Sequence, residues 1–394
     1  MKQLKTIILS TILSIALLLT ATPAMAFDVD NDSIDISLLT CGPGSEVWSE
    51  FGHTAVRIHD ITTGADVAVN YGMFSSNTPH FIPKFILGLT DYWVDVTPFD
   101  EFLAEYTYEG RSVIEQRLNI TPSDKAAIIK AIDSNIRPEN KVYRYNFFYD
   151  NCTTRARDII VGNLSGKVSY PPAEGDTCTY RAMLHRWTKD YPWTQFGEDL
   201  LLGIGADRPT TKAQQQFLPD NLRADFDRTV YNGHPLVVSS QMILMAQPHD
   251  NNGGFPLSPL DMAMILFVVT IALEIAEHRK KKIFWGIDVF YMLLTGLAGL
   301  IITTMIFSEH PTVRVNLLIL ILNPLPLVAL IPAIRKTIAH SRCHWWTVWE
   351  ILTVAFIIGG FFQHYPSGMI VLAFILLTRP LMHHYFEKKI YINK

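Results

Sequence analysis

Five apolar segments in the C-terminal third of this 394-residue chain constrain its fold more than any other feature. They run over residues 259–277, 283–307, 313–334, 346–364 and 366–385. A helix needs about 20 mainly apolar residues to cross the hydrocarbon core of a bilayer, and each segment is near that length. The sequence therefore predicts an integral membrane domain over residues 258–394, built as an all-α bundle of five transmembrane helices.

Basic residues occur in alternate loops of this predicted bundle, which sets its orientation. Lys and Arg are retained on the cytoplasmic side of a membrane. The opposite loops, "SEHPTVR" and "QHYPSG", contain a single Arg. The basic loops and the tail contain Arg279, Lys280, Lys281, Lys282, Arg335, Lys336, Arg342, Lys388 and Lys389. We therefore expect a cytoplasmic C-terminus, with the residues before 258 on the other side of the membrane.

The first 26 residues have the pattern of a cleaved export signal. The basic "MKQLK" precedes the apolar run "TIILSTILSIALLLT", and "ATPAMA" ends in the small-x-small pattern that signal peptidase prefers. An uncleaved anchor is the alternative, although the run is short for a bilayer span. Both readings place the following segment outside the cytoplasm, in agreement with the loop charges.

Residues 27–257 have the composition of one exported α+β domain. Strands are predicted at "IDISLLT", "HTAVRIHD", "DVAVNYGMF" and "RSVIEQRLNI", the middle two forming a hairpin around "ITTGA". Helices are predicted at "TPSDKAAIIKAIDSNI", with Thr121 or Ser123 as N-cap, and at "TYRAMLHRWTKDYP". No repeat or long linker divides this region.

Several familiar motifs are absent from the sequence. It contains no HExxH, no CxxC and no GxSxG; "GIGADR" lacks the last glycine of a dinucleotide fingerprint and "GNLSGKVS" is one residue short of a P-loop. The formal net charge of −4 offers no basic patch for nucleic acid. We therefore expect no metal, no cofactor and no nucleic-acid partner, which leaves cofactor-free covalent catalysis.

Cys152, in "YRYNFFYDNCTTRARD", is the cysteine with a distinctive setting. With Asp150 or Asn151 as N-cap, it falls in the first turn of a helix, where unpaired N–H groups and the macrodipole favour a thiolate. Arg155 and Arg157 would add to that field. The alternative is an inert core cysteine, the commoner fate of a free thiol.

The other three cysteines are Cys41, Cys178 and Cys343. Cys41 and Cys178 could pair in an oxidising compartment. Cys343 falls on the cytoplasmic side in the predicted topology and could not join them.

His53, in "EFGHTAVRI", is the best candidate base because it begins a strand directly after a glycine-containing loop. If the hairpin closes around Thr62 and Thr63, Asn70 shares the face of His53 and could orient its ring. Tyr71 and His59 are rival orienters, although His59 sits near the turn.

The order of these motifs resembles the permuted branch of the papain-like (NlpC/P60-type) thiol fold, which includes the lecithin-retinol acyltransferase relatives. "LLTCGPGSEVWSEFGHTAVRI", "NYGMF", "NFFYDNCTTRARD" and "FLPDNL", followed by several transmembrane helices, are more closely similar to the Lnb-type bacterial lipoprotein N-acyltransferases. The resemblance covers nearly the whole mature chain. The second histidine of the acyltransferase relatives has no clear equivalent, so the third catalytic position stays open.

This resemblance implies an enzyme of the bacterial inner membrane with its catalytic domain in the periplasm. It would move an acyl chain from a phospholipid, through a thioester on Cys152, to the α-amine of a diacylglyceryl-bearing lipoprotein. Catalysis is expected from Cys152, His53 and Asn70. Substrate contacts are expected from Tyr71, Asn151, Arg155, Glu309 and His310.

Two other functions fit the same residues. A thiol peptidase or amidase acting on peptidoglycan would use the same fold and the same catalytic dyad, His53 and Cys152. A non-enzymatic envelope factor could retain the dyad without using it. The sequence does not indicate an oligomeric state.

Overall fold

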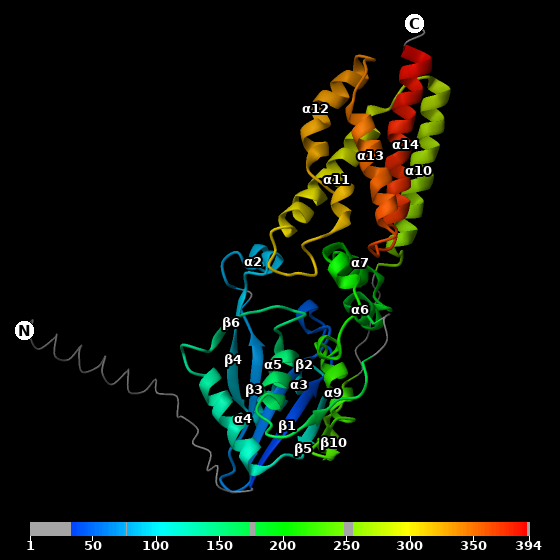
Figure 1. The fold of residues 1–394 in the computed structure, drawn as a ribbon. Helices are drawn as coiled ribbons and strands as arrows, with labels where there is room; N and C mark the ends of the chain where they lie inside the picture. The colour runs from blue at the N-terminus through cyan, green and yellow to red at the C-terminus, as the bar shows by residue number, and fades with distance from the viewer. Residues whose placement is uncertain (1–32, 76, 174–177, 248–254, 392–394) are drawn as a thin grey trace, which may run out of the picture.

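The computed structural model describes residues 33–75, 77–173, 178–247 and 255–391. The predicted signal, residues 1–26, lies outside them. Figure 1 shows an exported α+β body joined end-on to a bundle of membrane helices, in the order that the hydropathy pattern predicts. The permuted papain-like assignment remains a prediction.

The exported body is built on a seven-stranded antiparallel sheet with the order β10-β5-β1-β2-β3-β4-β6. Its strands are β1 (Ile34–Cys41), β2 (His53–Asp60), β3 (Asp66–Met73), β4 (Asp91–Pro98), β5 (Val113–Leu118), β6 (Val142–Arg144) and β10 (Val237–Leu244). A small second sheet contains β7 (Val168–Ser169), β8 (Val230–Tyr231) and β9 (His234–Pro235). The four strands predicted from alternating apolar residues are confirmed.

Helices cover both faces of the large sheet because its apolar residues alternate between two cores. On one face, Ile36, Val56 and Val69 pack with α4 (Pro122–Asn135), α5 (Cys152–Val161) and α9 (Pro219–Phe226). On the other face, Leu39 and Ala55 pack against α3 (Phe99–Tyr108). Thr121 caps α4 in a capping box, as its sequence predicts.

Short helices lie between the sheet and the membrane bundle (Figure 1). They include α2 (Phe81–Leu87), α6 (Tyr180–Thr188) and α7 (Pro192–Leu201). The exported body also contains α8 (Lys212–Gln215) and the 3₁₀ turns η1 (Val47–Ser49) and η2 (Ile204–Asp207). Arg181 of α6 is buried and links α6 to α7 and η2. Its guanidinium binds Asp199 of α7 at 2.6 Å and Asp207 of η2 at 2.7 Å, and it donates to Leu202 O at 3.0 Å.

The exported body is fixed to the membrane domain by backbone hydrogen bonds. Gly203 N–H donates to Thr312 O and Ile204 N–H to Val315 O, both at 2.8 Å. A Cβ at Gly203 would lie 2.2 Å from Val315 O, so only glycine permits this approach. The glycines of "GIGADR" therefore serve this junction, because Gly205 likewise lies close to the backbone of Pro311 and Thr312.

Within the described residues of the membrane domain, four helices are long and apolar enough to cross a bilayer. They are α10 (Pro259–Lys280), α11 (Trp285–Met305), the 3₁₀ turn η3 (Leu317–Leu320) with α12 (Leu325–Ile338), and α14 (Met369–Phe386) continuing into the π-helical turn η4 (Glu387–Tyr391). The other predicted segment forms the 15-residue helix α13 (Trp345–Gly359). At about 1.5 Å per residue it reaches about 22 Å, against a hydrocarbon core of about 30 Å. Five complete crossings therefore remain a prediction.

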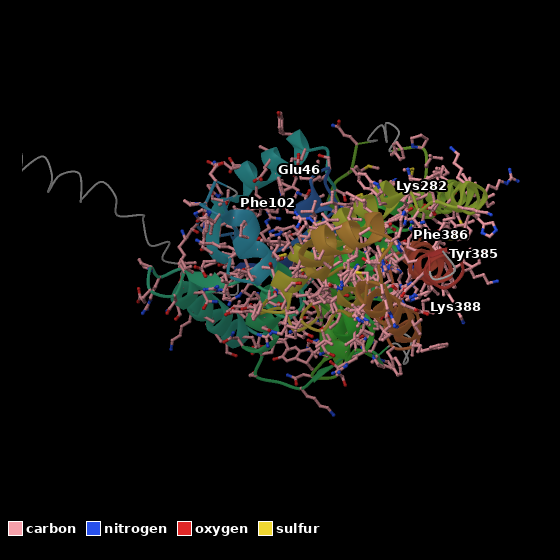
Figure 2. The ribbon with its side chains drawn as sticks, turned by 90° about the horizontal axis from the view of Figure 1, so that it is seen from above. Glu46, Phe102, Lys282, Tyr385, Phe386 and Lys388 are labelled. Atoms are coloured by element: carbon pink, nitrogen blue, oxygen red, sulfur yellow. The ribbon has the colours of Figure 1, made fainter. Side chains whose placement is uncertain are left out.

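The basic loops lie at the end of the bundle remote from the exported body. Figure 1 shows α14 running away from the exported body, so that Lys388 in η4 lies at its remote end, and Figure 2 labels Lys282 and Lys388 in the view from above. This is the arrangement that the loop charges predict.

A buried ionic cluster joins α10, α11 and α14 near that remote end. The guanidinium of Arg379 binds Glu277 at 2.7 Å and Asp288 at 2.8 Å, and Asp288 also binds His383 at 2.9 Å. Glu274 completes the cluster. Charges inside a membrane domain are stable only when paired in this way.

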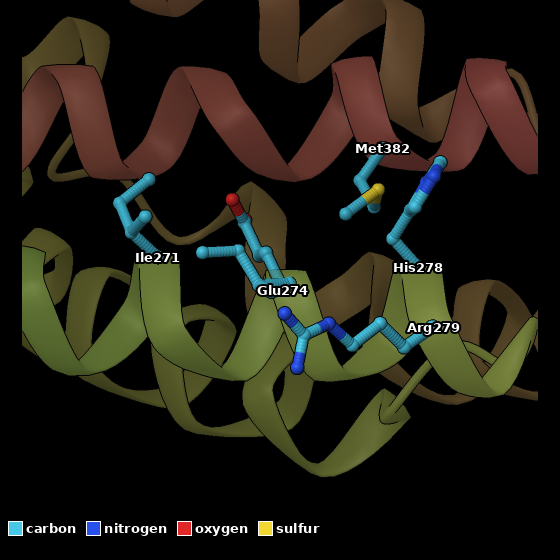
Figure 3. Close-up of a pocket in the computed structure, with 6 residues that line it drawn as sticks. Ile271, Glu274, His278, Arg279 and Met382 are labelled. Atoms are coloured by element: carbon cyan, nitrogen blue, oxygen red, sulfur yellow. The ribbon is translucent and has the colours of Figure 1, made fainter.

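Figure 3 shows a neighbouring cavity of about 310 Å³ between α10 and α14, lined by Ile271, Glu274, Ile275, His278, Arg279 and Met382. It belongs to the remote end of the bundle and contains no thiol.

Candidate active site

Cys152 is the first residue of α5, and Asn151 is its N-cap. The Asn151 side chain accepts from Thr154 N–H at 2.9 Å, while the Thr154 hydroxyl accepts from Asn151 N–H at 2.9 Å. This reciprocal pair fixes the helix start, so the thiol stands where the helix dipole favours negative charge. Of the two predicted caps, Asn151 is therefore the one used.

The hairpin register places His53 beside Asn70, as predicted. Ala55 pairs with Asn70 across β2 and β3, so His53, two residues earlier, shares the face of Asn70. The His53 Nε2–H donates to Asn70 Oδ1 at 3.2 Å. Because this bond occupies one ring nitrogen, it leaves Nδ1 for another partner.

His53 and Cys152 form a coupled pair. Burial alone would raise the pKa of the Cys152 thiol, but the charge of His53 and a hydrogen bond with its ring outweigh burial and lower this pKa to about 7. Burial lowers the pKa of His53, but the charge of Cys152 and its hydrogen bond outweigh this effect and raise the pKa above its usual value. A thiolate beside an imidazolium is therefore a stable state near neutral pH.

Two further groups hold the sulfur in place. The Thr54 backbone N–H donates to Sγ, and the Thr153 hydroxyl lies 3.8 Å from it. Gly72 on β3 has φ +87°, and a Cβ there would lie 3.3 Å from the Cys152 Cβ. Glycine thus permits both the backbone turn and the close approach of α5 to β3.

An aromatic cavity of about 80 Å³ opens beside the thiol. Cys152, His53 and Gly72 form part of its wall. Its aromatic lining residues are Trp48, Phe51, Phe74, Tyr92, Tyr145, Phe147 and Phe217. Tyr92 and Tyr145 stack with ring centroids 4.0 Å apart. Such a wall suits an apolar ligand.

A larger cavity of about 540 Å³ lies beside His53 and extends along α3. His53, Asn70 and Gly72 line its inner end, and Arg111 lines it as well. Its carboxylates belong to Glu46, Glu105 and Glu109. Figure 2 shows Glu46 close to Phe102, another lining residue, on the flank of the exported body. The dyad thus borders one aromatic and one charged cavity.

Cys41 provides an internal contrast to Cys152. It pairs with His53 across β1 and β2, but it is buried in the core beneath α3. Burial raises the pKa of its thiol to about 12. Cys41 and Cys178 form no disulfide, because they belong to separate clusters.

Three predicted substrate-binding residues have structural partners. Tyr71 is buried in the core, where its hydroxyl accepts from Asn135 at 3.0 Å. Asn151 Nδ2 donates to Phe147 O at 2.9 Å and to the Phe217 carbonyl. Arg155 forms a bidentate ion pair with Asp150 at 2.6 and 2.8 Å. Asn151 lines the aromatic cavity, and the binding roles of all three remain predictions.

The other two predicted contacts, Glu309 and His310, lie against α2 and are absent from the described lining of both cavities. Glu309 N–H donates to Leu87 O at 2.8 Å, and His310 lies 3.2 Å from the position of a Cβ at Gly88. They join the two domains, and their contact with substrate remains a prediction. The rival orienter His59 pairs with Asp66 at the opposite end of the hairpin.

Sequence reasoning missed most of the cavity walls. Tyr145 and Phe147 stand within the motif that contains Cys152, and Trp48 precedes His53 by five residues, so proximity to the motifs could have indicated them. Tyr92 and Arg111 carry no such local signal.

The depressed thiol pKa has a direct consequence for labelling. The rate of Cys152 alkylation by iodoacetamide in the folded protein should rise with pH and level off above about 7, because the thiolate forms there. Cys41 should stay unlabelled at pH 8, because its thiol is buried with a pKa of about 12. Peptide mapping by mass spectrometry would measure both; a Cys152 rate that still climbs steeply above pH 8.5 would contradict the ion pair.

Comparisons with known families identify both parts of the chain. Residues 21–186 match the family model of the Lnb N-terminal periplasmic domain, and residues 250–390 match that of the Lnb transmembrane domain. No significant match was found among curated proteins or solved structures. The two models together cover most of the chain, in the order seen in Figure 1. The chain therefore belongs to the Lnb family of lipoprotein N-acyltransferase-type membrane proteins.

Proposed function

We propose that this protein is a cysteine-dependent lipoprotein N-acyltransferase of the bacterial inner membrane. In this proposal it moves an acyl chain from a phospholipid to the α-amine of a diacylglyceryl lipoprotein. The observation that carries the proposal is the Cys152–His53 pair at the end of the sheet nearest the membrane helices. There β3 ends beside Cys152 and the chain continues into α2, which contacts the membrane domain.

In the first step, the Cys152 thiolate attacks the carbonyl carbon of a phospholipid ester. The C–O bond breaks and the imidazolium of His53 gives its proton to the departing glycerol oxygen, which leaves a thioester and a lysophospholipid. The backbone N–H groups of Cys152 and Thr153 lie in the first turn of α5, where they have no acceptor within the helix. They would stabilise the developing oxyanion.

In the second step, the amine of the lipoprotein attacks the thioester carbonyl. Neutral His53 takes a proton from the amine, the C–S bond breaks, and the thiolate–imidazolium pair is restored. An α-amine has a pKa of about 7.7–8.0, so part of it is already neutral at pH 7. The exchange of an ester for an amide runs downhill without ATP.

A series of aromatic rings would guide the acyl chain between the membrane and the thiol. Phe74 lies 5.0 Å from Tyr92 in the aromatic cavity and 5.5 Å from Phe81 on α2, measured between ring centroids. Phe85 continues the series at 6.1 Å from Phe81. Leu87 at the end of α2 meets Glu309 of the membrane domain. Apolar methylenes gain free energy along such a path.

Reconstitution tests the proposal. The full-length protein in phospholipid vesicles, given a synthetic diacylglyceryl peptide with a free N-terminal amine, should yield N-acyl peptide and equimolar lysophospholipid by mass spectrometry. The expected cellular counterpart is loss of lipoprotein N-acylation on deletion of the gene. Unchanged N-acylation in the deletion strain would overturn the proposal, and release of cell-wall peptides from peptidoglycan instead would favour the peptidase alternative.

A further inference from the structure

The wall of the charged cavity beside His53 contains a buried arginine. Arg111 is only 6% exposed, yet it lines this cavity. Its Nε donates to Gly42 O at 2.8 Å and its Nη1 binds Glu109 at 2.8 Å. No described residue accepts a hydrogen bond from its Nη2. A buried guanidinium nitrogen without an acceptor is costly, and a ligand oxygen would remove that cost.

Carboxylates line the same cavity around this guanidinium. Glu105 is exposed on α3, Glu109 is exposed at the C-cap of α3, and Glu46 is exposed beside η1. Glu109 is paired with Arg111, while the described ion pairs do not include Glu46 or Glu105. The cavity thus combines one buried cationic donor with exposed anionic groups, which matches a ligand that carries a negative and a positive charge a short distance apart.

We propose that this cavity binds the headgroup of the acyl donor, with its phosphodiester on Arg111 and its ammonium group against Glu46 and Glu105. This inference rests on the function proposed above and specifies its donor: a zwitterionic phospholipid with an ammonium headgroup is preferred over one with an anionic glycerol headgroup. The acyl part and the alcohol part of the attacked ester lie in different cavities, on either side of His53 and Cys152. The acyl chain lies in the aromatic cavity, and the departing oxygen lies toward His53 and the charged cavity.

The α-amine of the lipoprotein acceptor is a less suitable ligand for this cavity than the phospholipid headgroup. Nearby carboxylates raise the pKa of an amine and keep it protonated, whereas attack on a thioester needs the neutral form. A quaternary or primary ammonium on a headgroup needs no deprotonation, so the carboxylates assist its binding without opposing the chemistry.

A headgroup competition tests this inference. Full-length protein receives vesicles of a neutral carrier lipid containing phosphatidylethanolamine or phosphatidylglycerol, and single-turnover release of each lysophospholipid is measured without acceptor. We expect the wild type to favour phosphatidylethanolamine about fivefold, as exposed charge pairs permit. The Glu46→Lys/Glu105→Lys variant should favour phosphatidylglycerol. Glu101→Lys, the same type of substitution at one α3 position outside the described lining, should leave the preference unchanged.

Arg111 gives the second arm of the test. Arg111→Gln should slow release from both lipids about 10- to 100-fold, because it loses a charge-assisted hydrogen bond to the phosphate. Thermal unfolding would check that this variant folds. If it does not fold, the headgroup preferences of Glu46→Lys/Glu105→Lys and Glu101→Lys still test the inference.

Three outcomes would overturn the inference: an unchanged headgroup preference in Glu46→Lys/Glu105→Lys, no preference in the wild type, or an effect confined to peptide acylation by pre-acylated enzyme, which would make this the acceptor site. Failure of the proposed function looks different, since the wild type would then release no lysophospholipid from any vesicle.

Discussion

Cys152→Ala is expected to reduce both lysophospholipid release and N-acylation at least about 10³-fold, because the Cys152 thiol combines a depressed pKa with an adjacent imidazole, whereas burial raises the pKa of the Cys41 thiol. The protein should remain folded, since Cys152 is only partly buried and alanine leaves the Asn151 cap intact. The measurement is the single-turnover rate in phospholipid vesicles, with thermal unfolding as the check on folding.

Cys41→Ala is the matched control. Cys41 lies directly across from His53 in the β1–β2 register, but its thiol is buried and remains protonated. This variant should keep its activity within a few-fold, with some loss of stability from the small cavity. Full complementation of a deletion strain by Cys152→Ala would instead favour a non-enzymatic role.

His53→Gln is expected to reduce both half-reactions about 10²- to 10⁴-fold, the range for a positioned acid–base group. Glutamine can still reach Asn70, but it cannot carry the positive charge that lowers the pKa of Cys152. Without that charge burial dominates, so the pKa of the thiol should rise above its ordinary value of 9.0. The alkylation rate of Cys152 should then be low at pH 7 and rise only in alkaline solution.

His59→Gln provides the comparison on the same strand. His59 shares the face of His53 by alternation, yet it pairs with Asp66 near the turn. Activity and the pH profile of alkylation should be unchanged in this variant. A wild-type alkylation profile in His53→Gln would show that the imidazole does not control the thiol.

The parts of the site that follow local rules could be predicted from the sequence. A hairpin with period-two alternation has only one register that keeps Val56 and Val69 in the core, and that register also places Asn70 beside His53. The start of α5 follows from the capping preference of Asn151. These two local features indicate His53 and Cys152 separately, whereas their approach depends on the packing of α5 against β2 and β3.

The cavity walls depend on contacts that the sequence does not encode locally. Tyr92 begins a strand whose mixed pattern "DYWVDVTP" shows no clear alternation, and it meets Tyr145 only because β4 pairs with β6. Arg111 follows a helix end and reaches Gly42 across 69 residues. Helices α2 and α3 were likewise not identified, because each is short and adjoins prolines.

Hydropathy located the membrane helices but not their lengths. The apolar run over 346–364 forms α13 only to Gly359, after which Gly360 and the turn to Gly368 interrupt it. Arg379, the partner of Glu274 and Asp288, could not be inferred from the sequence, since it lies about 100 residues away on α14.

The most direct test of the account is the mass of the acyl-enzyme. Full-length protein incubated with vesicles of one defined phospholipid and no acceptor should gain the mass of one fatty acid minus water. The gain should map to the peptide containing Cys152, be removed by neutral hydroxylamine, and disappear when diacylglyceryl peptide is added, with N-acyl peptide formed in equal amount. N-acyl peptide formed at the same rate with no adduct on Cys152, or with Cys152 blocked by iodoacetamide, would contradict the thioester mechanism.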